Sequence, residues 1–181
     1  MLSIQSQHLC NILNGKKTLE IRRTVPKGFV GLVYLYCTKG KPYLFNLEEK
    51  WITLDTPSFS SLVNDSPFLN GKVVARFRLD KMSFADYTTI EFNSNLLKEA
   101  CLTEKELIDY IGEQELRGYS KFYCWHIKKL EIFDEPKELG GFYTYDNSYD
   151  NSFGEYFEDR DKYVPLKRSP QSWQYCYAKE E

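Results

Sequence analysis

The first pattern in the chain is helical. In residues 6–15, SQHLCNILNG, the apolar residues Leu9, Ile12 and Leu13 recur at the spacing of one face of an amphipathic helix. Gly15 follows at the position where helices commonly end in the left-handed conformation. The pattern predicts a short helix that ends in a glycine turn.

The period then changes from helical to extended. The segment TLEIRR, residues 18–23, alternates with the two-residue period of a half-buried strand. Leu19 and Ile21 would lie on one face of this strand. Glu20 and Arg22 would lie on the other face, together with Thr18.

Later segments predict further strands and a helix. Strand patterns cover 31–38, 43–46, 71–84, 122–133 and 171–178. The turn signal KGKP between the first two predicts a hairpin, and DEPKEL would end the strand 122–133. Residues 103–112 read as a helix, because Thr103 and Glu106 have the spacing of a capping box and Gly112 closes the segment.

This order of elements predicts one domain over residues 1–181, a mixed barrel or sandwich decorated by short helices. A composition of 42% hydrophobic and 28% charged residues is ordinary for a chain that buries its own core. The segment 141–161 is rich in Asp, Asn, Ser and Gly, and predicts a long acidic surface loop.

Composition argues against several classes of site. The five cysteines are scattered without a CxxC spacing, and the two histidines lie far apart, so we expect no disulfide framework, no metal and no cofactor. No apolar run approaches the roughly 18 residues of a spanning helix, and the N-terminal residues show no targeting pattern. The expectation is a cytoplasmic protein without membrane contact.

The net charge of −2 conceals an asymmetry. Residues 1–45 are strongly basic, with Glu20 as their single acidic residue, whereas residues 131–161 are strongly acidic. A local basic face that meets a phosphate backbone is therefore compatible with an acidic chain.

Gly15, Lys17, Glu20 and Arg22 have the spacing G-x-K-x-x-E-x-R. This spacing, at a helix-to-strand turn, resembles the signature of ASCH domains, small β-barrels related to the PUA family of RNA-binding modules. The stretches GKVVARF, CLTEKELIDYIG, YCWHIKKLEIFDEPKEL and LKRSPQSWQYCY also resemble elements of phage and bacterial ASCH proteins. The resemblance implies an α+β fold, a PUA-like mixed β-barrel with short helices.

The same resemblance implies a cleft for RNA or a modified nucleoside beside the motif. Some related proteins are hydrolases, and Lys17 matches the catalytic lysine of small amidohydrolases that act on acetylcytidine. Where those enzymes carry a catalytic threonine this chain has Glu20, so their threonine-dependent mechanism does not transfer. Glu99 lies near the position of their catalytic glutamate, within about one residue of register.

The residue types fit such a cleft on chemical grounds. Arg22 offers a planar fork for a phosphate or a carbonyl, and Glu20 can accept a hydrogen bond from a base or hold Arg22 in place. The plainer interpretation makes these two a structural ion pair, and Lys17 a solvated turn lysine like Lys16.

Aromatic and polar residues near the C-terminus are further candidates. Gln171 and Ser172 enter the last predicted strand and would line the cleft, whereas Trp125, in an apolar strand pattern with Cys124 and Ile127, is expected in the core.

Three hypotheses follow. The first is a binding module for RNA or a modified nucleoside, with Lys17, Glu20, Arg22, Gln171 and Ser172 at the ligand. The second is a metal-independent hydrolase of RNA or of acylated nucleosides, with Lys17 and Glu20 as catalytic residues. The third is a phage accessory protein that binds a partner protein through residues 141–161.

Overall fold

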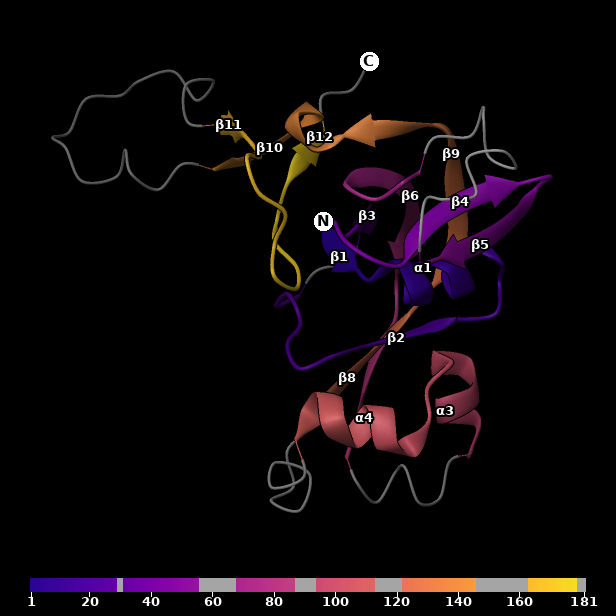
Figure 1. Cartoon of the computed structure of the whole chain (residues 1–181). Helices are drawn as coiled ribbons and strands as arrows, with labels where there is room; N and C mark the ends of the chain where they lie inside the picture. The colour runs from indigo at the N-terminus through magenta and orange to yellow at the C-terminus, as the bar shows by residue number, and fades with distance from the viewer. Residues whose placement is uncertain (29–30, 56–67, 87–93, 113–121, 146–162, 179–181) are drawn as a thin grey trace, which may run out of the picture.

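The computed structural model describes residues 1–28, 31–55, 68–86, 94–112, 122–145 and 163–178 (Figure 1). Its strands are β1 (Leu2–Ile4), β2 (Leu19–Arg22), β3 (Gly31–Cys37), β4 (Tyr43–Leu47), β5 (Lys50–Leu54), β6 (Lys72–Leu79), β7 (Met82–Ala85), β8 (Phe122–His126), β9 (Lys128–Glu138), β10 (Phe142–Tyr145), β11 (Tyr163–Pro165) and β12 (Tyr177–Ala178). The helices are α1 (Ser6–Leu13), α3 (Ser94–Ala100) and α4 (Glu104–Ile111), with a 3-10 turn η2 (Leu139–Gly141). The expected mixture, mostly strands with short helices, is confirmed.

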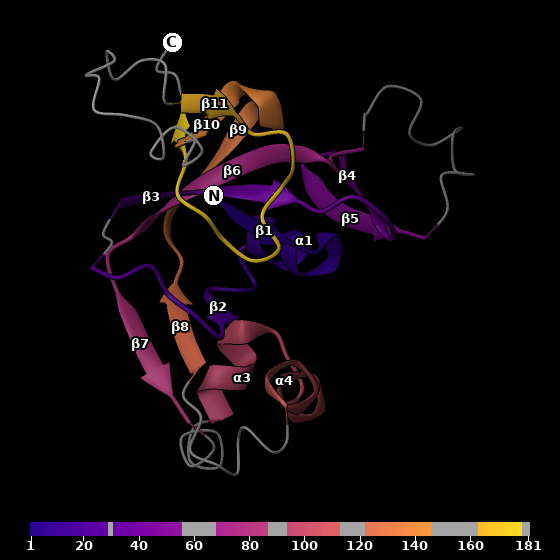
Figure 2. The same cartoon turned by 90° about the vertical axis from the view of Figure 1, so that its left-hand side faces the viewer.

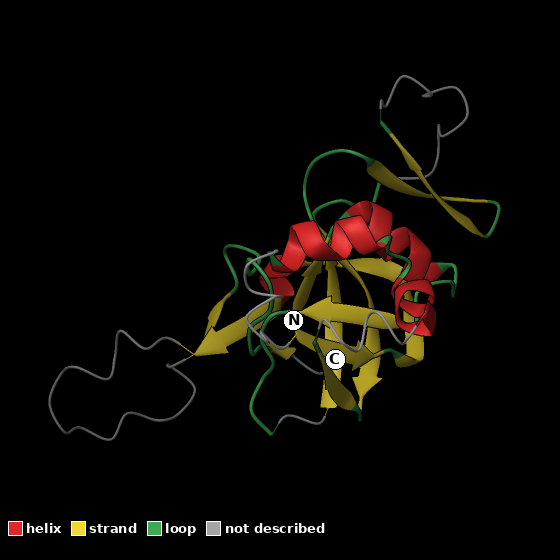
Figure 3. Ribbon diagram, turned by 90° about the horizontal axis from the view of Figure 1, so that it is seen from below, coloured by secondary structure: helices red, strands yellow, loops and turns green. Residues whose placement is uncertain are grey.

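In the part of the chain that the structure describes, the strands form four hydrogen-bonded sheets. The central sheet has the order β1-β3-β6-β9, with β1 parallel to β3 and the other pairs antiparallel. Smaller sheets have the orders β2-β8-β7, β11-β10-β12 and β4-β5. The β4–β5 hairpin and the β10–β11 pair project from opposite sides of the molecule (Figures 1 and 3). Within the described residues these ladders do not close into the barrel that the resemblance implied.

The described residues form three apolar clusters, two of which position the segment after α1. The larger packs α1 against one face of the central sheet, through residues such as Leu9, Leu35 and Phe77. The second packs α3 and α4 against the β2-β8-β7 sheet, through residues such as Ile21 and Leu107. Figure 2 shows these two helices beside β2 and β8, away from the central sheet. Strand β8 contributes Trp125 to the first cluster and Cys124 to the second, so its partner β2 lies where these two clusters meet.

The predicted helix, turn and strand at the start of the chain are confirmed. Helix α1 buries Leu9, Ile12 and Leu13 on one face. Gly15 has a φ of 69°, and its N–H donates to the carbonyl of Ile12 at 2.9 Å. A φ in this range is disfavoured for residues with a Cβ, which explains the glycine. The turn aims the chain directly into β2.

The predicted hairpin at KGKP is wrong. Strand β3 pairs with β1 and β6, whereas β4 pairs with β5. Most of β3 is buried, since it is an inner strand with a neighbour on each side. Local turn residues indicated where the chain turns, but the pairing was decided by burial over long sequence distances.

Two long strand predictions each contain a break. The segment 122–133 divides at Ile127, whose N–H donates to the carbonyl of Thr18 at 2.9 Å, and β9 then continues through the DEPKE sequence to Glu138. The segment 71–84 divides between β6 and β7. In both cases the alternating sequence pattern continues across the point where the chain passes from one sheet to another.

The C-terminal predictions are borne out only in part. Within 171–178 only β12 is a strand, and Trp173 forms an isolated bridge with Leu2. Of the predicted loop 141–161, Gly141 belongs to η2 and 142–145 form β10, while 146–161 lie outside the described residues. No helix in the described part of the chain is long and apolar enough to cross a membrane.

The capping box of α4 gives a direct test of local stability. The Thr103 hydroxyl accepts from the N–H of Glu106 at 3.2 Å, and the Glu106 carboxylate accepts from the N–H of Thr103 at 2.7 Å. We expect Thr103→Ala to lower the free energy of unfolding by about 1 kcal/mol. Urea denaturation measures this, and Thr103→Ser, which keeps the hydroxyl, should lose much less. Equal losses in the two variants would contradict a role for the cap.

Candidate functional site

The turn after α1 directs Lys17 into the protein. The N–H groups of Lys16 and Lys17 both donate to the carbonyl of Asn11, at 2.8 and 3.0 Å. Lys16 is exposed, whereas Lys17 is 3% exposed. The interpretation of Lys17 as a solvated turn lysine is therefore wrong.

A buried carboxylate lies between two buried cations. Glu20 Oε2 is 3.2 Å from Lys17 Nζ, and Glu20 Oε1 is 2.9 Å from Arg22 Nη2. Glu20 and Arg22 are 6% and 8% exposed. The predicted pairing of Glu20 with Arg22 is confirmed, but the pair is buried and includes Lys17. We call Lys17, Glu20 and Arg22 the charged triad.

Backbone carbonyls fix both cations of the charged triad. Lys17 Nζ donates to the carbonyl of Ala100 at the end of α3, at 2.6 Å. Arg22 Nη2 donates to the carbonyl of Ser3 in β1, also at 2.6 Å. Charge-assisted hydrogen bonds of this length are among the stronger ones in proteins. The triad thereby connects β1, β2 and α3.

Several buried polar atoms around the triad lack a hydrogen-bond partner. Among the described residues these atoms are Ser3 Oγ, Arg22 Nε, Trp125 Nε1 and Glu20 Oε2, the last of which still contacts Lys17. Trp125 is directly opposite Glu20 in the β2–β8 ladder, so their side chains share a face of that sheet. Buried donors without acceptors are uncommon in native proteins. Their gathering around one motif is typical of a binding site.

The charged triad lines a pocket of about 460 Å³. Strand β1 contributes Ser3, and the start of α1 contributes His8. Helix α4 contributes Glu106, Asp109 and Tyr110, and the other lining residues are Ile4, Gln5, Gln7, Ile21, Thr38, Leu102 and Gln171. The pocket therefore opens between the central sheet and the layer of α3 and α4.

The predicted ligand residues are divided between this pocket and its surroundings. Lys17, Glu20, Arg22 and Gln171 all line it. Ser172 does not line it, and its carbonyl instead accepts from the N–H of Ser3 at 2.9 Å. The carbonyl of Glu99, near the position suggested by the amidohydrolase resemblance, accepts from the N–H of Thr18 at 2.9 Å.

Sequence reasoning did not identify Ser3, His8 or Tyr110 as site residues. Ser3 is in a short apolar strand, and His8 is a lone histidine in an amphipathic helix. Tyr110 is far from the motif in sequence and reaches it only because α4 packs against β2 through Leu107. Trp125 was expected in the core, and its 2% exposure confirms this.

The pocket is close to electrically balanced. Its lining has two cations, Lys17 and Arg22, against the carboxylates of Glu20, Glu106 and Asp109. Burial lowers the pKa of His8, and the nearby charge of Lys17 adds to this, so the imidazole is neutral at pH 7. Within the described residues no group of His, Cys, Asp and Glu side chains could hold a metal ion.

Comparisons with known proteins find similarity in structure but not in sequence. No protein-family model and no curated protein sequence matches the chain. In structure, the chain is similar to the ASCH protein of Zymomonas mobilis and to two single-substitution variants of it. Each match has a TM-score of 0.49 and 19% sequence identity, and covers 76% of this chain and 71–73% of the other.

Removal of the central carboxylate should destabilise the protein. Glu20→Gln leaves Lys17 and Arg22 buried without a counter-charge, which we expect to lower the free energy of unfolding by about 3 kcal/mol. The matched control is Glu131→Gln, which breaks an exposed ion pair with Arg76 and should cost about 1 kcal/mol or less. Chemical denaturation measures both, and equal losses would argue against burial as the cause.

Stability should also fall in mild acid. The pKa of His8 lies below 6.5 in the folded protein because of burial, and that of His126 is lowered for the same first reason. The unfolded chain therefore binds these protons more readily, so the free energy of unfolding is highest above pH 6.5 and falls as the pH drops below it.

Denaturation at pH 7.5 and 5.5 measures this fall. His8→Asn should reduce the difference between the two values. An unchanged difference in that variant would show that His8 does not contribute.

Proposed function

We propose that the pocket beside the charged triad binds a single nucleobase, presented by RNA or by a free or modified nucleoside. The observation that supports this most directly is that Ser3 Oγ and Arg22 Nε are buried without a hydrogen-bond partner among the described residues, and that both residues line one pocket. A base supplies complementary donors and acceptors on its edge.

The size of the pocket suits a ligand of this class. A volume of about 460 Å³ lies within the usual range of roughly 300–1,000 Å³ for small-molecule sites. The polar groups within it are fixed in advance, because Glu20 holds Arg22 and the Ser3 carbonyl accepts from the same guanidinium. A fixed site loses less conformational entropy when a ligand binds.

The hydrogen-bonding groups suit the edge of a base. Arg22 Nε is a donor and Glu20 Oε2 an acceptor, and a nucleobase edge places a carbonyl or ring nitrogen beside an N–H group. Tyr110 also lines the pocket and is 39% exposed. The Arg23 guanidinium lies 5.6 Å from the centre of its ring, and Arg23 Nε donates to the Tyr110 carbonyl at 3.0 Å. Such a ring offers a surface for stacking.

The charge of the pocket favours entry of the base of a nucleotide rather than its phosphate. Both cations of the pocket are already paired with Glu20. Exposed basic residues next to the pocket in sequence are better placed for a backbone. Lys16 precedes Lys17, and Lys39 follows Thr38. An RNA strand would then insert one base and leave its phosphates on this basic rim.

A hydrolase of RNA or of an acylated nucleoside is the second candidate. It is favoured by the 3.2 Å separation of Lys17 Nζ and Glu20 Oε2, which is short enough for proton transfer between an amine and a carboxylate. Against it, Lys17 Nζ also donates to the carbonyl of Ala100, so both of its contacts serve to hold it in place. The third hypothesis rests mainly on residues 146–161, outside the described part of the chain, and stays a prediction.

Substitution of two serines, Ser3 and Ser6, distinguishes an effect on ligand binding from an effect on folding stability. Ser3 Oγ has no partner among the described residues, so Ser3→Ala should leave the free energy of unfolding unchanged or raise it. The same change should weaken nucleoside binding about fivefold, the effect of one lost hydrogen bond. Ser6 Oγ donates to the Pro42 carbonyl at 2.6 Å and does not line the pocket, so Ser6→Ala should show the reverse pattern.

The measurement is calorimetric titration with plain and acetylated nucleosides and with short single-stranded RNA, while products are followed by chromatography. Lys16→Ala and Lys39→Ala should weaken the binding of RNA and reduce its salt dependence, but not affect nucleosides. Product formed by the wild type and lost in Lys17→Ala would establish the hydrolase instead. Absence of binding by every probe would overturn the proposal.

A further inference from the structure

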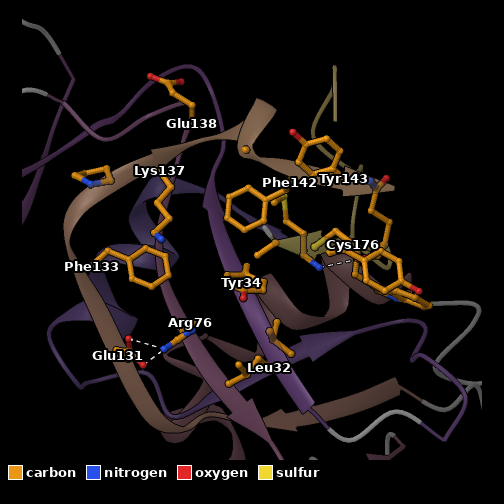
Figure 4. Close-up of a pocket in the computed structure, with 18 of the residues that line it drawn as sticks. Leu32, Tyr34, Arg76, Glu131, Phe133, Lys137, Glu138, Phe142, Tyr143 and Cys176 are labelled. Atoms are coloured by element: carbon orange, nitrogen blue, oxygen red, sulfur yellow. Dashed lines mark hydrogen bonds and ion pairs between the residues drawn. The ribbon is translucent and has the colours of Figure 1, made fainter. Parts of the chain in front are cut away.

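A second recess lies on the other face of the central sheet. Its floor is formed by Leu32 and Tyr34 of β3, Arg76 of β6 and Glu131 and Phe133 of β9, and Figure 4 shows these side chains on one face of the three strands. One wall is the bend of β9 at residues 134–138, and another is the C-terminal segment 173–178. The groove has a volume of about 1440 Å³. We call it the aromatic groove.

The aromatic groove exposes more apolar surface than a covered sheet face would. Tyr175 and Tyr177 are 52% and 56% exposed, and Leu32 is 45% exposed. Tyr34 and Phe133 are half-buried beneath them. Exposed apolar surface that is concentrated in one concavity is typical of an interaction site.

Acidic side chains outnumber basic ones in the lining of the groove. Its lining side chains include four carboxylates, Glu131, Asp134, Glu135 and Glu138, against the two cations Arg76 and Lys137. Among the described residues Glu131 is paired with Arg76 and Glu138 with Lys72. Within that same part of the chain, Asp134 and Glu135 form no ion pair. The wall on β9 is therefore negative, which repels the phosphates of a nucleic acid.

Two cationic side chains of the chain itself already contact the surface of the groove. Arg76 makes two hydrogen bonds to Glu131, Nε to Oε2 at 2.8 Å and Nη2 to Oε1 at 2.9 Å. Lys137 Nζ lies 5.3 Å from the centre of the Phe133 ring, a cation–π contact. Figure 4 shows both contacts within the groove. Guanidinium and ammonium groups are thus held here on a carboxylate and on a ring face.

We propose that the aromatic groove binds a basic peptide segment of a partner protein, one that alternates Arg or Lys with large apolar side chains. The cations would pair with Asp134 and Glu135, and the apolar side chains would pack on Leu32 and Tyr175. A volume of about 1440 Å³ exceeds the usual range of roughly 300–1,000 Å³ for one small molecule. The chain's own acidic residues 146–161 carry the wrong charge for this surface.

The test uses short labelled peptides and the full chain. One peptide alternates Arg with Leu, a second has Glu in place of Arg, and a third has Ser in place of Leu. Fluorescence anisotropy should show binding of the first and about tenfold weaker binding of the other two, since each lacks one of the two contributions.

Matched variants locate the site. Asp134→Asn with Glu135→Gln should weaken binding of the Arg-Leu peptide about fivefold. Glu49→Gln with Asp55→Asn, an equal change of charge on the exposed β4–β5 hairpin, should have no effect. Likewise Leu32→Thr should weaken binding, whereas Leu47→Thr, on the same hairpin, should not.

Several outcomes would overturn the proposal. The Glu peptide could bind as tightly as the Arg peptide, or the groove variants could bind like the wild type. Loss of RNA binding rather than peptide binding in Leu32→Thr would assign the groove to nucleic acid. Nucleoside binding measured on the same variants tests the other pocket independently, because none of these residues lines it.

Discussion

The ion pairs of Glu20 with Lys17 and Arg22 are the interaction on which the rest of the structure depends. Three charged groups are 8% exposed or less, at the point where the two apolar clusters meet. Desolvation of each ion costs several kcal/mol, and mutual attraction recovers this only with good geometry and further hydrogen bonds. Here Ala100 and Ser3 supply those bonds. Well-packed apolar residues in the same volume would often be at least as stable, so stability alone does not explain why three charged groups are buried here.

The ion pairs of Glu20 also set the charge of the pocket that the charged triad lines. Because Glu20 balances its neighbours, the pocket offers directed hydrogen bonds more than net charge, while the exposed Lys16 and Lys39 place positive charge outside it. The aromatic groove differs, with apolar and aromatic side chains beside the Arg76–Glu131 ion pair on its floor and a negative wall. One chain thus presents two concave surfaces of different chemistry on different faces.

The sequence predicted local structure better than it predicted pairing and burial. Periodicity and turn chemistry located α1, Gly15, β2 and α4 because each depends on neighbours in sequence. The break at Ile127 could not be predicted, since an alternating pattern does not show that a strand leaves one sheet for another. The two faces of β2 were predicted, but the burial of Glu20 was not. It depends on β1 and on α3, whose contacts with the triad link residues far apart in sequence.

The wall between the two recesses argues that they act independently. Strand β1 is parallel to β3 on one side and bound to the C-terminal segment on the other, where Ser3 N donates to the Ser172 carbonyl at 2.9 Å and Gln174 N to that of Met1 at 3.0 Å. Gln171 lines the pocket beside the charged triad, whereas residues 173–178 line the groove. Coupling between two sites requires an element with two arrangements that both ligands bias. The hydrogen bonds along both edges of β1 hold it in one arrangement, so we expect a ligand in one recess to leave the affinity of the other unchanged.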